Sequence, residues 1–265
     1  MRRALILALA PLWAAGAALA VCPPASEAEV YPTARVLPAN LLRMYVYFPR
    51  PMSMEAGVRD VAVLDASGTP VPGVFLETRQ DLWSPDRRRL TLLLDPGRVK
   101  TGLLAHEALG RALVVGAGYT LEVSDTVLDR NGCPLGQRLS HRFTVGEADG
   151  EPPAPGSWVM TVPDAGTTAP LIVALGSAHD HLSLAYRLRV KTAEGATVRG
   201  ALALGPGERS WHFTPAEPWA PAAYTLAVDA RLEDLAGNRP GHLFDRPADA
   251  PPQPWISARP FRPPG

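Results

Sequence analysis

The sequence predicts an all-β protein in which one domain plan occurs twice. Proline (29 residues) and glycine (23 residues) are frequent in this 265-residue chain, and this composition disfavours long helices. Short apolar segments recur between turn residues at intervals of about eight to twelve residues, as in β-sandwiches. In addition, the stretch "LEDLAGNRPG" at 232–241 has a weaker copy, "VLDRNGCPLG", at 127–136.

We expect the first β-sandwich over residues 30–146. Its clearest strand, "LRMYVYF" at 42–48, alternates in polarity, which predicts one buried face and one outward face. The predicted core face carries Leu42, Met44, Val46 and Phe48, and the opposite face carries Arg43, Tyr45 and Tyr47. Further strands are expected in "VRDVAVLD", "RRLTLLLDPG" and "GYTLEVSDTVLD", and "SHRFTVG" closes the domain. The stretch 96–117 is long for a hairpin connection and predicts a flap or a short helix.

An acidic, proline-rich stretch at 147–156 predicts a linker. A second β-sandwich is expected over 157–245, from "WVMTVP" to a closing strand in "GHLFD". We expect a disordered, proline-rich tail over 246–265, because proline lacks the N–H that a sheet requires.

The repeated loop has the form D-x-x-G-[NC] and follows a tyrosine-led strand in both halves. An aspartate can accept hydrogen bonds from the backbone of such a turn, and the glycine can adopt positive φ. The residues of this turn motif are Asp129, Gly132, Asp234, Gly237 and Asn238. In the first copy Cys133 stands where the second copy has Asn238. The motif is primarily a turn specification.

These stretches carry a resemblance to a known group of domains. "FPRPMS", "RLTLLLDP", "GYTLEVS" and "DRNGCPLG", with "HFTPAEPWAPAAYTLAVDARLEDLAGNRPG" in the second half, resemble the bacterial Ig-like domains of exported and surface proteins. The resemblance covers most of residues 30–245 and departs from the pattern at "LGSAHDHLS". It implies two tandem Ig-like β-sandwiches that serve as spacers, adhesion modules or accessory units, and it says little about activity.

The N-terminus predicts export. Residues 1–20 combine an arginine pair, an apolar run and the small residues Ala18 and Ala20 before Val21, as in a signal peptide. A short N-terminal segment, 21–29, would then precede the first domain. We expect a periplasmic, cell-surface or secreted protein with no transmembrane segment in the mature chain.

Two cysteines, Cys22 and Cys133, leave two main alternatives open. A disulfide between them is natural in an oxidising compartment and is the favoured interpretation. A lipid anchor at Cys22 is the competing one, since Leu19, Ala20 and Val21 precede it in an imperfect lipobox.

The candidates for chemistry are few. The "HDH" stretch supplies His179, Asp180 and His181, and with Asp234 these are weak candidates for a metal site; a solvated loop is the simpler interpretation. "HEALG" at 106–110 lacks the second histidine of a zinc-protease signature. Trp83, Trp158, Trp211 and Trp219 could stack on sugars or could pack in a core.

The sequence therefore predicts an exported, non-enzymatic binding, adhesion or scaffolding protein of the bacterial cell envelope. Lysine plus arginine and aspartate plus glutamate both count 26, so we expect no nucleic-acid partner. No cofactor is expected, and the partner, a protein or a surface glycan, is unknown. The alternative is a small-ligand module, for carbohydrate or metal, or an accessory unit of an extracellular enzyme system.

Overall fold

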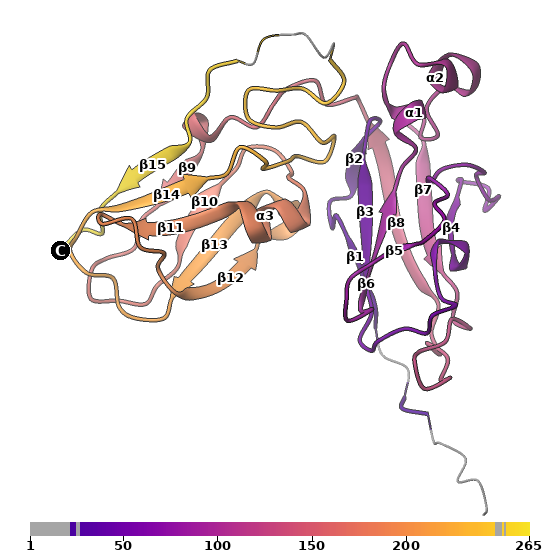
Figure 1. Ribbon diagram of the computed structural model, residues 1–265, viewed down its shortest axis with the longest axis horizontal. Coiled ribbons are helices and arrows are strands. Elements are labelled where there is room, and N and C mark those ends of the chain that lie inside the picture. Colours follow the sequence, from indigo (N-terminus) through magenta and orange to yellow (C-terminus); the bar gives the residue numbers. More distant parts are fainter. Residues whose placement is uncertain (1–21, 25–26, 247–250, 252) are drawn as a thin grey trace, which may run out of the picture.

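The computed structural model describes residues 22–24, 27–246, 251 and 253–265, and the predicted signal peptide lies outside them. The described chain is mostly β-structure, arranged in four sheets with a few short helices (Figure 1). No helix in the described part of the chain has the length and hydropathy needed to cross a bilayer.

The first half contains two sheets of four strands each. One sheet has the order β1 (Glu29–Tyr31), β3 (Arg43–Tyr47), β6 (Arg89–Leu93), β5 (Leu82–Trp83). The other has the order β2 (Val36–Pro38), β8 (Leu139–Gly146), β7 (Gly118–Val123), β4 (Val61–Leu64). Every pair of neighbours is antiparallel except β2 and β8, which are parallel.

The second half repeats this arrangement with small changes. Its first sheet has the order β12 (Gly200–Leu204), β13 (Ser210–Pro215), β10 (Leu171–Ala174), β9 (Val159–Thr161). Its second sheet has the order β11 (Leu188–Thr192), β14 (Tyr224–Val228), β15 (Ala258–Phe261). A short helix, α3 (His181–Arg187), precedes β11.

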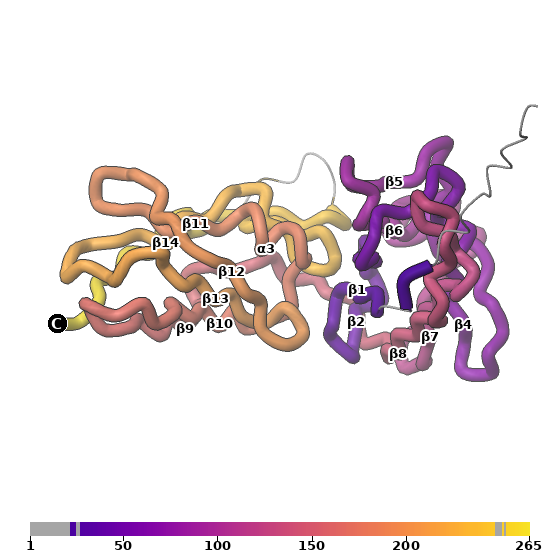
Figure 2. Tube along the Cα trace, turned by 90° about the horizontal axis from the view of Figure 1, so that it is seen from below, coloured from indigo at the N-terminus to yellow at the C-terminus, as the bar shows by residue number. Residues whose placement is uncertain are grey.

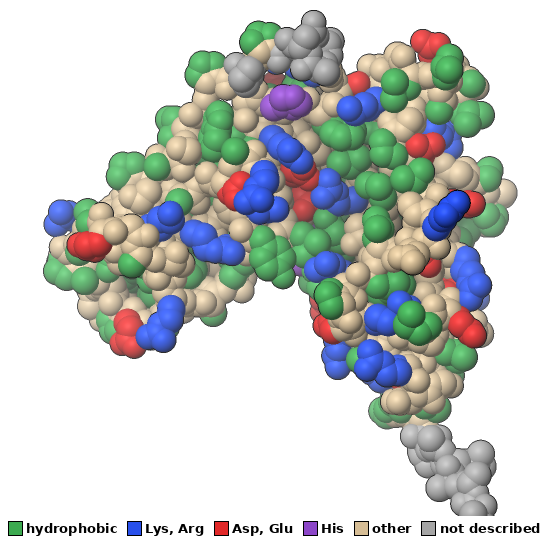
Figure 3. Space-filling view, in the orientation of Figure 1, with side chains coloured by type: hydrophobic (Ala, Val, Ile, Leu, Met, Phe, Trp, Pro, Cys, Tyr) green, Lys and Arg blue, Asp and Glu red, His purple; other side chains and the backbone are tan. Residues whose placement is uncertain are grey.

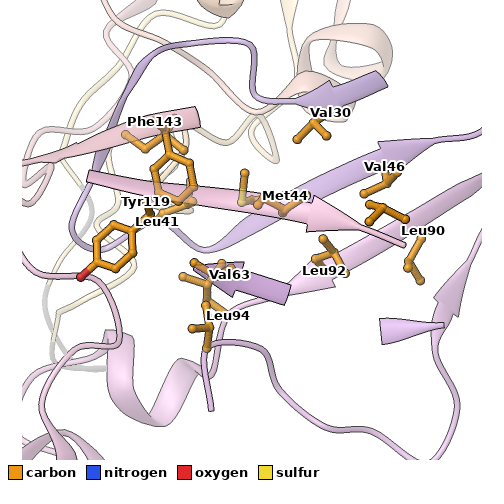
Figure 4. Packing of buried hydrophobic residues seen from close by; sticks show 14 of the residues in the cluster. Val30, Leu41, Met44, Val46, Val63, Leu90, Leu92, Leu94, Tyr119 and Phe143 are labelled. Atoms are coloured by element: carbon orange, nitrogen blue, oxygen red, sulfur yellow. The ribbon is translucent and has the colours of Figure 1, made fainter. Parts of the chain in front are cut away.

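Each half has its own apolar core between its two sheets. In the first half, alternate residues of β3, β6 and β7 meet between the sheets, as Figure 4 shows for Met44, Leu92 and Tyr119. The second core is richer in aromatic residues, and the rings of Trp211 and Phe213 stack within it at 5.6 Å. Burial of these apolar side chains supplies the main driving force for folding in both halves.

The same hydrogen bonds recur at equivalent places in the two halves. The hydroxyl of Tyr119 accepts a hydrogen bond from the Val114 N–H, and the hydroxyl of Tyr224 accepts one from the Ala220 N–H, both at 3.1 Å. Tyr119 stacks on Phe143, and Tyr224 stacks on Phe261, in the neighbouring strand. A bonded tyrosine at a sheet corner is a feature of Ig-type sandwiches.

The closing strand of the second half is not the predicted one, and part of the predicted disordered tail is ordered. The closing strand is β15, within residues 246–265, rather than "GHLFD"; Phe261 is buried in the second core. Pro260 is tolerated because it occupies an edge strand. Since the Val228 N–H donates to the Ser257 carbonyl, the register places Pro260 at a position whose N side faces away from β14.

The predicted linker at 147–156 packs against the protein. The Asp149 N–H donates to the side-chain oxygen of Asn40 at 2.8 Å, and the Asp149 carbonyl accepts from the Asn40 amide at 2.8 Å. The same carbonyl also accepts a hydrogen bond from the side chain of Asn238 at 3.3 Å. This segment is therefore held by side chains from both halves.

The structure contains a disulfide between Cys22 and Cys133, with Cα atoms 5.4 Å apart. This pairing is the favoured sequence interpretation, and such bonds are typical of exported proteins. Between β6 and β7, the predicted flap at 96–117 forms two short helices, α1 (Pro96–Val99) and α2 (Leu104–Leu109). Val99 and Leu113 anchor this flap in the first core.

The end of the second half that carries α3 faces the β1–β3 sheet of the first half (Figures 1 and 2). The centre of β3 is therefore buried on both faces: Tyr45, on the face opposite the first core, is only 1% exposed. Both predicted faces of β3 are present, but the outward one meets protein at Tyr45 and stays partly exposed at Arg43 and Tyr47.

Candidate functional site: a buried polar interface between the halves

The repeated loop has the same geometry in both halves. In the first, the Asp129 carboxylate accepts hydrogen bonds from the N–H groups of Asn131 and Cys133 at 2.8 and 3.0 Å. In the second, the Asp234 carboxylate accepts them from Ala236 and Asn238 at 2.8 and 2.9 Å.

The glycine of each loop adopts the conformation that the motif predicts. Gly132 and Gly237 both have φ of 79°, a region that residues with a Cβ rarely occupy. A Cβ on Gly237 would in addition lie 2.5 Å from Leu42 of the first half. The second copy of the loop therefore lies against the other half, and its glycine also permits this close approach.

The two loops differ in what neutralises the aspartate. Arg50 forms an ion pair with Asp129 at 2.9 Å. Ser177 takes the place of Arg50 in the second half, and among the described residues no basic side chain forms an ion pair with Asp234. The hydrogen-bond donors of the Asp234 loop lower the pKa of this carboxyl only partly. Burial and the nearby charge of Asp149 raise that pKa to about 7.

The "HDH" stretch at 179–181 occupies the place of "MSM" at 52–54 in the first half. Met52 forms a β-bridge with Asp129, and His179 forms the equivalent bridge with Asp234. The Met52 N–H donates to the carbonyl of Arg87, and the His179 N–H donates to the carbonyl of Glu208, both at 3.0 Å. His179 is thus a core residue at a methionine position.

Arg87 and Glu208 are themselves equivalent, and both have positive φ without being glycine. Arg87 uses its side chain within its own half, where it donates to the Met52 carbonyl at 3.0 Å. Glu208 uses its side chain between the halves: its carboxylate accepts from the N–H and the hydroxyl of Thr33 at 2.8 and 3.0 Å. Since Glu208 is 1% exposed, its carboxylate is almost completely desolvated.

Two further contacts join β3 to the second half. The Tyr45 hydroxyl donates to the Asp180 carboxylate at 2.7 Å. The Arg43 guanidinium pairs with Glu233 at 2.6 Å and lies 4.0 Å from Asp180. Arg239 adds a second cation to Glu233, also at 2.6 Å.

Backbone and aromatic contacts complete this interface. The Leu42 N–H donates to the carbonyl of Leu235 at 2.9 Å. The ring of His181 lies on Tyr31, with centroids 3.7 Å apart, and contacts Tyr47 at 5.5 Å. Figure 3 shows charged side chains of both signs gathered where the two halves meet.

The interface pairs opposite charges, but it also buries them, and the two effects shift the pKa values in opposite directions. Burial raises the pKa of Asp180 above its ordinary value, although Arg43 and the Tyr45 hydroxyl oppose this shift. Burial lowers the pKa of Arg43, but Tyr45, Asp180 and Glu233 together outweigh that effect and raise it. Buried ion pairs of this kind lose hydration, and only close, well-aligned contacts offset the free-energy cost of that loss.

Three of the four predicted metal candidates are adjacent in sequence, but the candidates do not converge on one site. His179 packs edge-on against Trp158 in the second core, whereas His181 faces the tyrosines of the first half. Among the described residues, no group of three or more histidine, cysteine, aspartate or glutamate side chains could hold a metal ion. The arrangement instead joins the two halves of the chain.

The sugar-stacking hypothesis is wrong for three of the four tryptophans that suggested it, because these three are buried. Trp158, Trp211 and Trp219 are only 2–3% exposed. Trp83 lies under the guanidinium of Arg87, 4.6 Å from its ring centroid. Trp158, Trp211 and Trp219 therefore pack inside the second half, and Trp83 packs against the first core while remaining half-buried.

The sequence reasoning missed Arg43, Tyr45, Thr33 and Glu208 as interface residues. An amphipathic strand with an arginine and a tyrosine on its outer face looks the same whether that face meets water or another domain. Glu208 could have been found by aligning the two copies, because it stands opposite Arg87 in the repeat.

We expect His179→Met to raise the free energy of unfolding by about 1–3 kcal/mol at pH 7. Among the described residues the His179 Nε2 atom is buried without a hydrogen-bond partner, and methionine is the residue of the first copy. Burial lowers the pKa of His179 to about 4. The wild type therefore loses stability as the pH falls from about 6.5 to 4, and the variant should not. Urea unfolding at several pH values measures both effects; a less stable variant at every pH would contradict them.

The stability contributed by Asp234 should depend on pH in the opposite direction to that of His179, and Asp234→Asn should remove this dependence. Because the pKa of Asp234 is raised to about 7, its contribution to stability is full below about pH 4 and is lost as the pH rises through 7. Relative to wild type, the variant should gain up to about 4 kcal/mol between pH 4 and 8. Asp129→Asn is the matched control, since it breaks an ion pair and should destabilise the protein at pH 7. Parallel pH profiles for Asp234→Asn and wild type would refute the prediction.

Comparisons with known proteins do not assign this chain. No family model matches it, and no curated protein matches it. One solved structure that it resembles is a crystal structure of a mouse coronavirus receptor-binding domain complexed with its murine receptor; the match has 9% identity and covers 77% of this chain and 92% of that chain. Its TM-score of 0.20 is too low to carry an argument about fold or function. The assignment of this chain therefore rests on its own all-β structure and its buried interface.

Proposed function

We propose that this chain is an exported, non-enzymatic scaffolding or binding protein of the cell envelope, built from two Ig-like domains that act as one rigid unit. The observation that carries the proposal is the interface. Three side-chain contacts, Arg43–Glu233, Tyr45–Asp180 and Thr33–Glu208, tie the halves together through largely buried groups.

Rigidity of this kind suits a scaffold. A loop or sheet edge on one half is held at a fixed distance and angle from the other half, so a partner that contacts both loses less conformational freedom on binding. Tandem domains joined by an exposed flexible linker would lack this advantage, whereas here Asn40 and Asn238 hold the linker at Asp149.

The disulfide supports an oxidising compartment. The test is intact-mass spectrometry of the protein from the soluble and membrane fractions of the cells that produce it, with and without reduction. We expect a chain that begins at Val21 and gains two hydrogens on reduction. An acylated Cys22, or a full-length reduced chain in the cytosol, would contradict the proposed soluble, disulfide-closed form.

The binding role has its own test. Fluorescently labelled mature protein should bind saturably to envelopes from the same cells, and unlabelled protein should compete. Non-saturable retention, or none, would contradict a binding role and leave a purely structural one.

A further inference from the structure

Strand β12 is an edge strand of the second half that lacks the usual protection of sheet edges. It pairs with β13 on one side only, and residues 200–203 are exposed. Its sequence, "GALAL", contains no charge and no proline. Natural proteins usually blunt an edge with charges, proline, shortness or a covering segment.

The other edge strands show such protection. Charged residues or prolines occur in four of them, namely Glu29 in β1, Pro38 in β2, Arg189 and Lys191 in β11, and Pro260 in β15. Strands β5 and β9 have two and three residues. The hairpin after β4 covers that strand, since the Val71 N–H donates to the Val63 carbonyl at 2.8 Å.

The hydrogen-bond ladder shows which backbone groups of β12 remain free. Just beyond the strand, the Gly205 N–H donates to Ser210 and the Arg199 carbonyl accepts from Ala216, both at 2.9 Å. In an antiparallel pair the bonded positions alternate, so Ala201 and Ala203 bond to β13. The N–H and carbonyl groups of the even-numbered residues, Leu202 among them, point to the open side.

A groove of about 380 Å³ lies beside this open edge, between β12 and β11. Its apolar floor includes Leu188, Val190, Leu202, Trp211 and Phe213. Two cations, Arg189 and Arg199, also line it, and none of the described residues lining it is acidic. The groove therefore offers apolar contacts and positive charge directly beside unpaired backbone groups.

We propose that β12 and this groove accept an extended peptide strand of a partner protein, with alternating apolar side chains and a carboxylate next to them. The strand adds to the sheet through the free groups of β12. Alternate side chains then point into the groove, because successive residues of a strand face opposite sides. The carboxylate pairs with Arg189 or Arg199.

A second copy of this chain fits the site less well. Pairing β12 with its own copy would bring two grooves together, each lined by two arginines, and like charges at close range repel. The inference rests on the binding role proposed above and names a surface for it, but its test needs only the purified protein.

The probe is a short synthetic peptide of alternating valine and threonine with glutamate at both ends. We expect amide hydrogen exchange of Leu202 and Leu204 to slow when the peptide is added, whereas Ala201 and Ala203 are protected already. Leu202→Asp places an anion in the apolar groove beside the glutamates of the peptide and should weaken binding at least about tenfold. Ala203→Asp adds the same charge to the same strand on the opposite face, and its affinity should stay within about twofold of wild type.

Thermal unfolding of both variants establishes that they are folded. A peptide with lysine in place of glutamate should bind more weakly, and one with a central proline should not bind. Several results would overturn the proposal: no binding of the glutamate peptide, equal effects of the two substitutions, or dimerisation through β12 without peptide. Each of these removes the β12 surface but leaves the envelope-binding test of the proposed function untouched.

Discussion

Arg43→Ala is expected to lower the free energy of unfolding by about 2–4 kcal/mol and to increase the motion of the two halves relative to each other. Loss of one partner from a buried ion pair costs about 3–5 kcal/mol, because the other charge remains buried. Arg43 is partly exposed, and Arg239 still pairs with Glu233, so the expected cost is smaller. Urea unfolding measures the first effect, and NMR relaxation of each half measures the second.

The control is Arg138→Ala. Arg138, which directly precedes β8, pairs with Glu122 of β7 at 3.3 Å near the surface, and such pairs contribute about 0–1 kcal/mol. If Arg43→Ala proved as mild as Arg138→Ala, the interface would not be a determinant of stability.

Removal of the disulfide should have an effect of comparable size or larger. The bond joins residues 111 positions apart, and closing a loop of that length stabilises a protein by about 4–5 kcal/mol in the chain-entropy model. The double variant Cys22→Ser with Cys133→Asn tests this, because asparagine is the residue at the equivalent place in the second copy. We expect its first half to unfold at a lower urea concentration.

The control is the wild type after reduction, which should unfold like the double variant. A reduced wild type that unfolds like the oxidised protein would show that the cross-link adds no stability. A double variant much less stable than the reduced wild type would show that the introduced asparagine disturbs the loop.

The repeated plan could be predicted from the sequence because its signals are local. Asp129 and Asp234 organise their turns with backbone bonds inside five residues, and the adjacent glycines need positive φ for the same reason. Alternation in "LRMYVYF" likewise depends only on the period of a strand. Such features can be recognised in a single sequence, because they do not depend on which parts of the chain contact each other.

The interface could not be predicted because it depends on which surfaces meet. Arg43 and Tyr45 lie on the outer face of β3. Their partners, Glu233 and Asp180, are more than a hundred positions away in the sequence, so the pattern of the strand alone does not reveal these contacts. The closing strand β15 was not predicted because it contains a proline. Pro260 excludes a central strand but not the free side of an edge strand.

The two halves differ at equivalent positions where the second half contacts the first. Glu208 and Asp180 stand where Arg87 and Ser53 stand in the first half, and their carboxylates accept hydrogen bonds from Thr33 and Tyr45 of the other half.

The most direct test of the account is the measurement of residual dipolar couplings for both halves in one weakly aligned sample. If the buried contacts lock the halves, one alignment tensor fits the couplings of residues 30–146 and 157–245 in the wild type. Two tensors of different magnitude are expected only for Arg43→Ala. Two tensors in the wild type would contradict the rigid unit, and with it the scaffold role that we propose.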